Sequence, residues 1–184
     1  MTDTLRRAAI LIALAAGTTA SAGDIYTWTA LGTGYRHSFG LDAGGLSIAG
    51  YLGVQTGWFG VEYESQWSND HTLKPPEDRL AARNTNWLNI LIAPIHAQRM
   101  RLMLDVGPGL GWIRPPGKVA APSRSMSWGL HEHLRLDFRL GDDDVSAFVG
   151  FRVGAMHLWQ DTLAPPVEHG FDAMILIGFG PSFR

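Results

Sequence analysis

Two histidines and an aspartate have the residue types of a metal site. His131 and His133 are separated by one residue, and Asp105 lies in an earlier segment of similar pattern. Side chains two residues apart in an extended strand point to the same face, so both imidazoles can approach one zinc ion. Asp105 then supplies a third ligand or orients one histidine. A packed polar network without metal explains the same residues with fewer assumptions, and this is what we expect.

Glu62 and Glu64 are the second pair with catalytic residue types. Two nearby carboxylates are the acid and base of glycoside hydrolysis. That reaction needs an accessible cleft between the carboxylates, and the spacing implies none. We therefore expect both side chains to be partners of buried cations.

The overall composition limits the kind of domain that positions these groups. The chain has 184 residues, of which 46% are hydrophobic and 17% charged, and this suits one folded domain rather than a disordered tail or a charged coiled coil. A net charge of −2 offers no cationic surplus for phosphates, which argues against nucleic-acid binding. The absence of cysteine excludes disulfide scaffolds, thiolate metal sites and cysteine nucleophiles.

Residues 1–22 have the organisation of a secretory signal peptide. Arg6 and Arg7 precede a short apolar run, and Ala20-Ser21-Ala22 matches the A-x-A cleavage pattern. We expect cleavage after Ala22, which leaves residues 23–184 as the exported domain. The apolar run is too short to span a bilayer as a helix, and no other stretch is longer, so membrane insertion would have to use strands.

After this segment, apolar residues recur at every second position, which is the period of a β-strand with two different faces. The clearest example is 128–140, where Leu134 and Leu136 alternate with His133 and Arg135. The pattern predicts eight strands, near 25–35, 44–55, 59–67, 86–96, 100–112, 128–140, 145–153 and 171–179.

Two kinds of connection join the predicted strands. An even number of strands with short turns at one end and long polar loops at the other is typical of outer-membrane barrels, whose loops face outward and whose turns face the periplasm. The short turns are 55–57, 97–99 and 141–144, and the predicted loops are about 35–43, 69–85, 113–125 and 160–170.

The tryptophans gather at the ends of the predicted strands. Tryptophan prefers the boundary between water and hydrocarbon, because its ring is apolar and its N–H needs a hydrogen bond. We therefore predict two aromatic belts, with Trp67, Trp87, Trp112, Trp128 and Trp159 near the outer ends of the strands and Trp28 and Trp58 near the inner, periplasmic ends. The first strand leaves open which way Tyr26 and Trp28 face.

The whole pattern resembles the small eight-stranded outer-membrane β-barrel proteins of Gram-negative bacteria. The signal peptide, the eight strands, the two kinds of connection and the closing segment from Ala173 to Arg184 support this resemblance, which covers essentially the whole mature chain. It implies an all-β, eight-stranded, antiparallel up-and-down transmembrane barrel. In such proteins the barrel-assembly machinery recognises an aromatic residue at the end of the last strand, and Phe183 resembles that residue, one place before the terminal Arg184.

An eight-stranded barrel encloses a space that side chains fill, so we expect a plugged lumen rather than an open pore. With apolar rows facing lipid, the charged rows face inward, where an unpaired ion would lose several kcal/mol of solvation. Glu62 and Glu64 should therefore face Arg135 or Arg152. The predicted lumen network comprises Glu62, Glu64, Asp105, His131, His133, Arg135 and Arg152.

Two residues conflict with this pattern. Glu132 falls on the predicted lipid face, and Pro108 falls inside a strand of a barrel that has no edge. We expect a local bulge at each. Gly107 to Gly111 superficially resembles a phosphate loop but lacks a following lysine and helix, which favours small lumen-facing residues.

These observations predict a non-catalytic barrel without a cofactor, which contacts outer-membrane lipids and acts through its external loops or by supporting the envelope. Positive charge at the outer leaflet favours contact with anionic lipopolysaccharide. The residues that provide it are Arg36, His37, Lys74, Arg79, Arg83, Arg114, Lys118 and Arg124.

Two alternatives stay open. Some barrels of this size modify lipid A with a serine and a histidine near the outer rim, although the His-x-Ser-Asn arrangement of a deacylase is absent here. A soluble periplasmic barrel of the lipocalin kind would instead turn Leu130, Leu134 and Phe151 inward around a lipid. The residue pairs that could serve the enzyme are His37 with Ser38, Ser68 with His71, Ser127 with His131, and His157 with Asp161.

Overall fold

The computed structural model describes residues 25–39, 43–72, 80–97, 99–114, 125–141, 145–160 and 167–181. The predicted signal peptide, residues 1–22, lies outside these ranges. Within them, no helix has the length and apolar character needed to cross a membrane.

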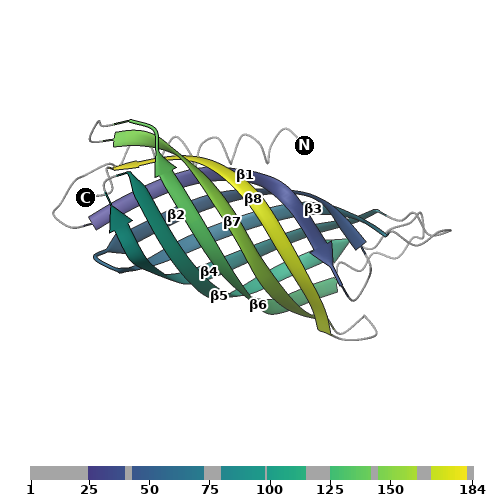
Figure 1. Cartoon of the computed structure of the whole chain (residues 1–184). Helices are drawn as coiled ribbons and strands as arrows, with labels where there is room; N and C mark the ends of the chain where they lie inside the picture. The colour runs from purple at the N-terminus through teal and green to yellow at the C-terminus, as the bar shows by residue number, and fades with distance from the viewer. Residues whose placement is uncertain are drawn as a thin grey trace, which may run out of the picture.

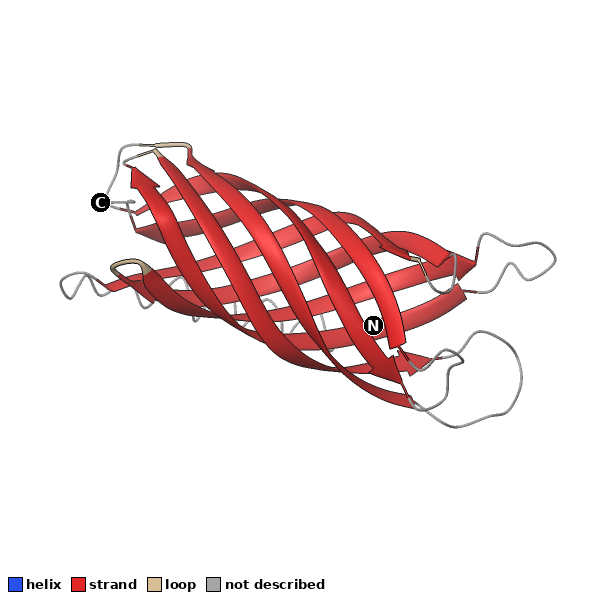
Figure 2. Ribbon diagram, turned by 60° about the horizontal axis from the view of Figure 1, so that its bottom comes forward, coloured by secondary structure: helices blue, strands red, loops and turns tan. Residues whose placement is uncertain are grey.

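The chain forms a closed barrel of eight strands, each antiparallel to its neighbours and arranged in sequence order (Figure 1). The strands run at a marked tilt around the barrel, and among the described residues Figure 2 shows strands, loops and turns but no helix. The prediction of an all-β antiparallel barrel is confirmed. The strands are β1 (Ile25–Ser38), β2 (Ala43–Thr56), β3 (Phe59–Thr72), β4 (Leu80–Ala97), β5 (Met100–Arg114), β6 (Ser125–Arg139), β7 (Val145–Gln160) and β8 (Val167–Pro181).

Several strands are longer than the sequence pattern predicts. β3 continues to Thr72 and β4 begins at Leu80, so the predicted loop 69–85 shrinks to 73–79. The pattern failed there because neither segment shows apolar alternation. The end of β3, from Ser68 to Thr72, is polar on both faces, and β4 begins with Leu80, Ala81 and Ala82 before the polar residues 83–86.

The two ends of the barrel differ in their connections. The turn end holds the chain reversals at 57–58, 98–99 and 140–144, and the loop end holds those at 39–42, 73–79, 115–124 and 161–166. The contrast is weaker than predicted, because the 39–42 connection is no longer than the reversal at 140–144. The longest connection is 115–124 rather than the one before β4.

The ladders are regular at the two positions where we expected bulges. Glu132 pairs with Val106 on one side and Ala155 on the other without any change of register. Pro108 pairs in register with Leu130 on β6. It has no N–H to donate, and two residue pairs are missing from the β4–β5 ladder at this point, after which the ladder resumes in the same register. Among the described ladders, the shift of register lies between Ile92 and Ile95 of β4.

The ladder that closes the barrel joins β1 and β8, which lie side by side in Figure 1. It begins only at Thr29 and Phe179, whereas the β1–β2 ladder begins at Ile25 and Thr56. The first residues of β1 therefore pair on one side only, which makes this closing ladder shorter than its neighbour.

The barrel has an apolar outside, and its inside holds the buried charged residues together with an apolar cluster around Phe148 and Leu176. Leu130, Leu134 and Phe151 are exposed on the outer face, while charged residues of the same strands are buried within. This arrangement overturns the lipocalin alternative, in which those three residues would line the interior. The wall of the barrel is thus built to place ionic side chains in its lumen.

Candidate functional site in the barrel lumen

The half of the lumen nearer the turn end contains a chain of ion pairs, the turn-side cluster. Arg135 donates through Nη1 to Glu62 Oε2 at 2.6 Å and through Nε to Asp137 Oδ1 at 2.8 Å. Arg101 Nη2 donates to the other oxygen of Asp137 at 2.9 Å. The indole N–H of Trp28 donates to Glu62 at 2.8 Å, so each carboxylate here has two donors.

The middle of the lumen contains a second group of ion pairs, on the loop side of the first, which we call the loop-side cluster. Arg152 donates to both oxygens of Glu64, at 2.6 and 2.9 Å, and to Asp172 at 3.0 Å. His133 lies between two carboxylates, with Nδ1 at 2.9 Å from Asp105 and Nε2 at 3.5 Å from Asp172. A bidentate arginine–carboxylate pair fixes geometry as well as charge, so these side chains are held rigidly.

Tyr51 lies between the two clusters and contacts one arginine of each. Its ring has the guanidinium of Arg152 at 5.0 Å and that of Arg135 at 5.7 Å from the ring centroid. Its hydroxyl donates to the sulfur of Met174 at 3.0 Å. The two arginines are on adjacent strands at directly paired positions, and the aromatic face accommodates both positive charges.

Large inward-facing rings lie opposite glycines on the neighbouring strand. Trp87 is paired with Gly109, and His133 with Gly154, and in both cases an added Cβ would collide with the ring. Trp87 in turn stacks on His131, with ring centroids 4.1 Å apart. The glycines therefore provide the space that lets rings fill the narrow lumen, which is the role that the pattern from Gly107 to Gly111 suggested.

His131 and His133 lie close enough to a third ligand for a metal site, but the candidate ligands already have protein partners. Ligand atoms of Glu64, His131 and His133 lie within 4.8 Å of one another. Each has a protein partner, since Glu64 binds Arg152, His133 binds Asp105, and His131 contacts the side-chain oxygen of Asn89. A metal ion would have to displace an arginine and then remain beside its positive charge, so these donors suit a salt-bridge network.

The carboxylate pair is equally enclosed. Glu62 and Glu64 are 1% and 0% exposed, and each is bound to its own arginine. A sugar ring has no access to either group. The geometry therefore gives no support to glycoside hydrolysis.

The serine–histidine pairs suggested for a lipid A enzyme are not arranged for nucleophilic attack. Ser38, Ser68 and Ser127 are buried in the lumen, away from the lipid-facing surface. His37 alternates with Ser38 and points to the opposite face. The side chain of His71 and the whole of Asp161 lie outside the described residues.

Two tryptophans are not where the belt prediction placed them. Trp28 and Trp87 are 4% and 1% exposed and point into the lumen. The prediction for Trp87 was wrong because it used the position along the strand and ignored the face that Trp87 shares with Asn89. The facing of Trp28, which the sequence left open, is inward. The remaining tryptophans are at the surface, with Trp58 in a turn and Trp67, Trp112, Trp128 and Trp159 on the outer face near the loop end.

Two of the cations expected in external loops are also inside the barrel. Arg36 belongs to β1 and Arg83 to β4, and both are buried. They extend the polar lumen toward the loop end. Lys74, Arg79, Lys118 and Arg124 lie outside the described residues, as does the side chain of Arg114.

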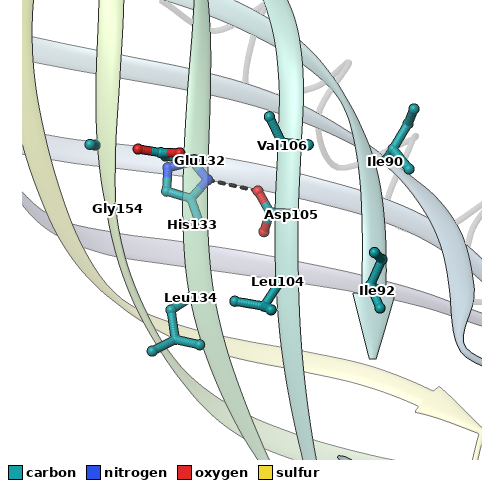
Figure 3. A pocket seen from close by; sticks show the side chains of 10 residues that line it. Ile90, Ile92, Leu104, Asp105, Val106, Glu132, His133, Leu134 and Gly154 are labelled. Carbon is teal, nitrogen blue, oxygen red and sulfur yellow. Dashed lines mark hydrogen bonds and ion pairs between the residues drawn. The ribbon is translucent and has the colours of Figure 1, made fainter. Parts of the chain in front are cut away.

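Residues from both faces of β6 lie around a shallow hollow in the outer wall (Figure 3). His133 and Asp105 bond to each other on the inner side, while Leu104 and Leu134 project from the outer side. Glu132 is exposed on this outer face, in the middle of β6. It is the acidic residue that departs from the apolar character of its row.

A second set of polar side chains on the outer face forms hydrogen bonds among its own members. Tyr63 and Ser65 on β3 both donate to the side-chain oxygen of Asn86, at 2.7 and 2.9 Å. Asn86 donates in turn to Asn84 at 3.0 Å. These mutual bonds reduce the cost of placing amides and hydroxyls on a surface that is otherwise apolar.

The predicted network lacked Arg101, Asp172, Asp137 and Trp28, of which Trp28 was assigned to an aromatic belt. Alternation was sufficient to find the first two, because Asp172 lies between outward-facing Phe171 and Ala173, and Arg101 shares a face with Asp105. Nothing in the local sequence distinguishes Trp28 as a hydrogen-bond donor to Glu62.

No protein-family model and no curated protein matches the chain. Solved structures do match it in fold. Neisserial surface protein A (NspA) aligns with a TM-score of 0.57 and 13% identity over 86% of this chain and 97% of that one. The chain has the fold of the small outer-membrane β-barrels.

Two further structures show the same likeness. The outer membrane protein OprG from Pseudomonas aeruginosa has a TM-score of 0.50 and 13% identity over 89% of this chain and 97% of that one. Ail, the attachment invasion locus protein of Yersinia pestis, has a TM-score of 0.50 and 12% identity over 85% and 98%. These identities establish a common architecture and nothing about shared ligands.

Proposed function

We propose that this protein is a non-catalytic integral protein of the outer membrane, with a sealed lumen and with its activity located at the loop end. The observation that supports this most directly is the reversed burial of the barrel. Most described leucine, isoleucine and phenylalanine side chains are outside, and the arginine, aspartate and glutamate clusters are inside, beside a smaller apolar cluster that includes Leu91, Phe148 and Leu176. Such a surface is stable in hydrocarbon and unstable in water.

Expression in a Gram-negative host tests the location. The protein should remain in the outer-membrane fraction after a urea wash, require detergent for extraction, and change its gel mobility on boiling. Recovery in the osmotic-shock fluid would contradict the proposal. Mass spectra of lipid A should be identical with and without expression, and a new lipid A species would instead support the enzyme.

The lumen network argues for a protein that does not conduct ions. Both clusters are buried, and their arginines bridge carboxylates from different strands. Purified protein in a planar bilayer should therefore give no stepwise conductance. Reproducible open channels would show that the network opens.

Lipopolysaccharide is the partner that we propose for the loop end. Lys74 and Arg79 lie between β3 and β4, and Lys118 and Arg124 lie between β5 and β6, so four cations share this end of the barrel. Lysine and arginine bind phosphate through charge-assisted hydrogen bonds. Replacing all four with alanine should weaken binding to lipopolysaccharide vesicles and reduce its dependence on salt.

A matched control lies at the opposite end. Asp142, Asp143 and Asp144 belong to the reversal between β6 and β7, and their replacement with alanine should leave lipopolysaccharide binding unchanged. Equal binding by the wild type and the variant lacking the four cations would remove lipopolysaccharide from the proposal without affecting the barrel.

Processing and assembly complete the proposal. Cleavage after Ala22 would give a mature chain beginning at Gly23, which intact-mass measurement of the outer-membrane protein would detect. Phe183 is the residue that we expect the barrel-assembly machinery to recognise. Phe183→Ala should lower the amount of folded barrel, with Ser182→Ala as the control, and equal yields would contradict this role.

A further inference from the structure

Two histidines on the outer face, near the loop end, take part in neither the lumen network nor the apolar rows. His157 on β7 and His169 on β8 are directly paired in the ladder. Their Nδ1 atoms are 2.7 Å apart, and the rings are exposed and nearly perpendicular, with centroids separated by 5.0 Å and planes at 76°. Two nitrogen donors from adjacent strands thus converge on one point outside the barrel.

We propose that His157 and His169 form a binding site for a divalent transition-metal ion, with Cu²⁺ as the preferred ion. Imidazole nitrogens are good ligands for copper, nickel and zinc, and Cu²⁺ has the highest affinity for a given nitrogen site in this series. The two histidines supply two neighbouring positions, and water fills the others.

The spacing of the nitrogens favours tetragonal over tetrahedral coordination. Two ligands about 2.0 Å from a metal and at a right angle to each other are about 2.8 Å apart, whereas tetrahedral zinc separates its ligand nitrogens by about 3.3 Å. The observed 2.7 Å leaves the separation of the nitrogens almost unchanged in the first arrangement, and the rings need only turn so that both lone pairs point at the metal. Zinc requires the rings to separate by about half an ångström.

Proton balance is compatible with metal binding at neutral pH. In the metal-free pair, one Nδ1 carries a hydrogen and donates it to the other Nδ1. When a metal binds both Nδ1 atoms, that hydrogen leaves through solvent and Nε2 of the same ring is protonated, so each imidazole stays neutral. Acid opposes binding, because a protonated imidazole has no lone pair for the metal.

The surrounding structure holds the donors in place and leaves the metal positions open. Both histidines lie in regular paired strands, and the carbonyl of His169 accepts a hydrogen bond from the N–H of Phe39 at 2.9 Å. Phe39 directly follows the end of β1, so His169 is level with the rim of the barrel wall there. The pair differs in this from His131 and His133, whose rings are buried among the ion pairs of the lumen.

The test uses the full-length mature protein, without a polyhistidine tag, in detergent micelles. Titration calorimetry with Cu²⁺ should show one ion per chain, and the electron paramagnetic resonance spectrum should show coupling to two equatorial nitrogens. His157→Ala and His169→Ala should each weaken binding about tenfold or more and remove the two-nitrogen signature. Both positions are at the surface, and heat-dependent gel mobility will show that each variant is folded.

His37→Ala is the matched control, because His37 is another outward-facing histidine near the rim, on β1. It should retain wild-type affinity and the two-nitrogen spectrum. Binding that survives in both His157→Ala and His169→Ala, or that is lost in His37→Ala, would overturn the site. Tighter binding of Zn²⁺ than of Cu²⁺ would overturn the tetragonal assignment.

Discussion

The two faces of β6 place opposite demands on their residues. The inner row contains His133, Arg135 and Asp137, each bonded to a group on another strand or on its own strand. The outer row contains Leu134 and Phe138, which make no such bonds and need only an apolar surrounding. Stability on the inside depends on specific partners, whereas stability on the outside depends on depth and hydropathy.

The largest expected effect comes from breaking a buried ion pair. Arg152→Met leaves Glu64 without its arginine, and removing one partner of a buried pair costs about 3–5 kcal/mol. We expect a large decrease in the free energy of unfolding, measured by tryptophan fluorescence in urea with the barrel in lipid vesicles.

The double variant Arg152→Met with Glu64→Leu is the control. It should recover most of this loss, because both charges are gone and Asp172 keeps its contacts with His133 and Gln66. An unchanged midpoint for the single variant would show that partner identity inside the barrel has little influence.

The next effect concerns depth on the outer face. Leu134→Arg places a charge in the middle of β6, where a lipid-facing arginine costs about 2–4 kcal/mol. Leu46→Arg, near the loop end of β2, should cost only about 0–1 kcal/mol, because an interfacial arginine reaches water. Equal losses in the same urea assay would show that the outer face does not sense hydrocarbon depth.

A smaller effect is expected where a ring lies opposite a glycine. Gly109→Val places a branched side chain against the Trp87 ring, and overpacking of this kind costs about 1–3 kcal/mol. Gly50→Val is the control, because an added Cβ there meets only Leu31 at 4.0 Å. If both variants unfold at the same urea concentration, the ring does not need the space that glycine provides.

The smallest effect has the opposite sign. Glu132→Leu removes an acidic group from the outer row and should stabilise the barrel in vesicles by about 1 kcal/mol, since acidic residues cost less than arginine on a lipid face. Glu132→Gln should give a smaller gain. Destabilisation by both substitutions would mean that Glu132 has a favourable partner on the membrane side.

Alternation in the sequence was sufficient for the fold. The rows that contain Leu134 and Arg135 are distinguishable by hydropathy alone, so the number of strands and the facing of β6 follow from period two. Trp28 and Trp87 were assigned from their place near strand ends rather than from alternation, and an amphipathic ring suits a lumen as well as an interface. Arg36 was assigned to a loop because it is polar and lies near a strand end.

The sequence pattern does not determine which charged residues pair with each other across the lumen. Glu62 and Glu64 belong to one row, yet one binds Arg135 and the other Arg152. That choice depends on the stagger of the strands around the barrel, which brings residues of β3 opposite residues of β6 and β7. Stagger is a property of the closed ring and leaves no trace in the local pattern of any single strand.

The short closing ladder between β1 and β8 has a consequence for how the molecule forms. Every other ladder joins consecutive strands and can grow from a hairpin, whereas this one must bring together the two ends of the chain. Until it does, both terminal strands present unpaired amides, which hydrocarbon does not tolerate. Ring closure and entry into the bilayer should therefore be a single kinetic event. Its barrier should be set by the pairing of β1 with β8.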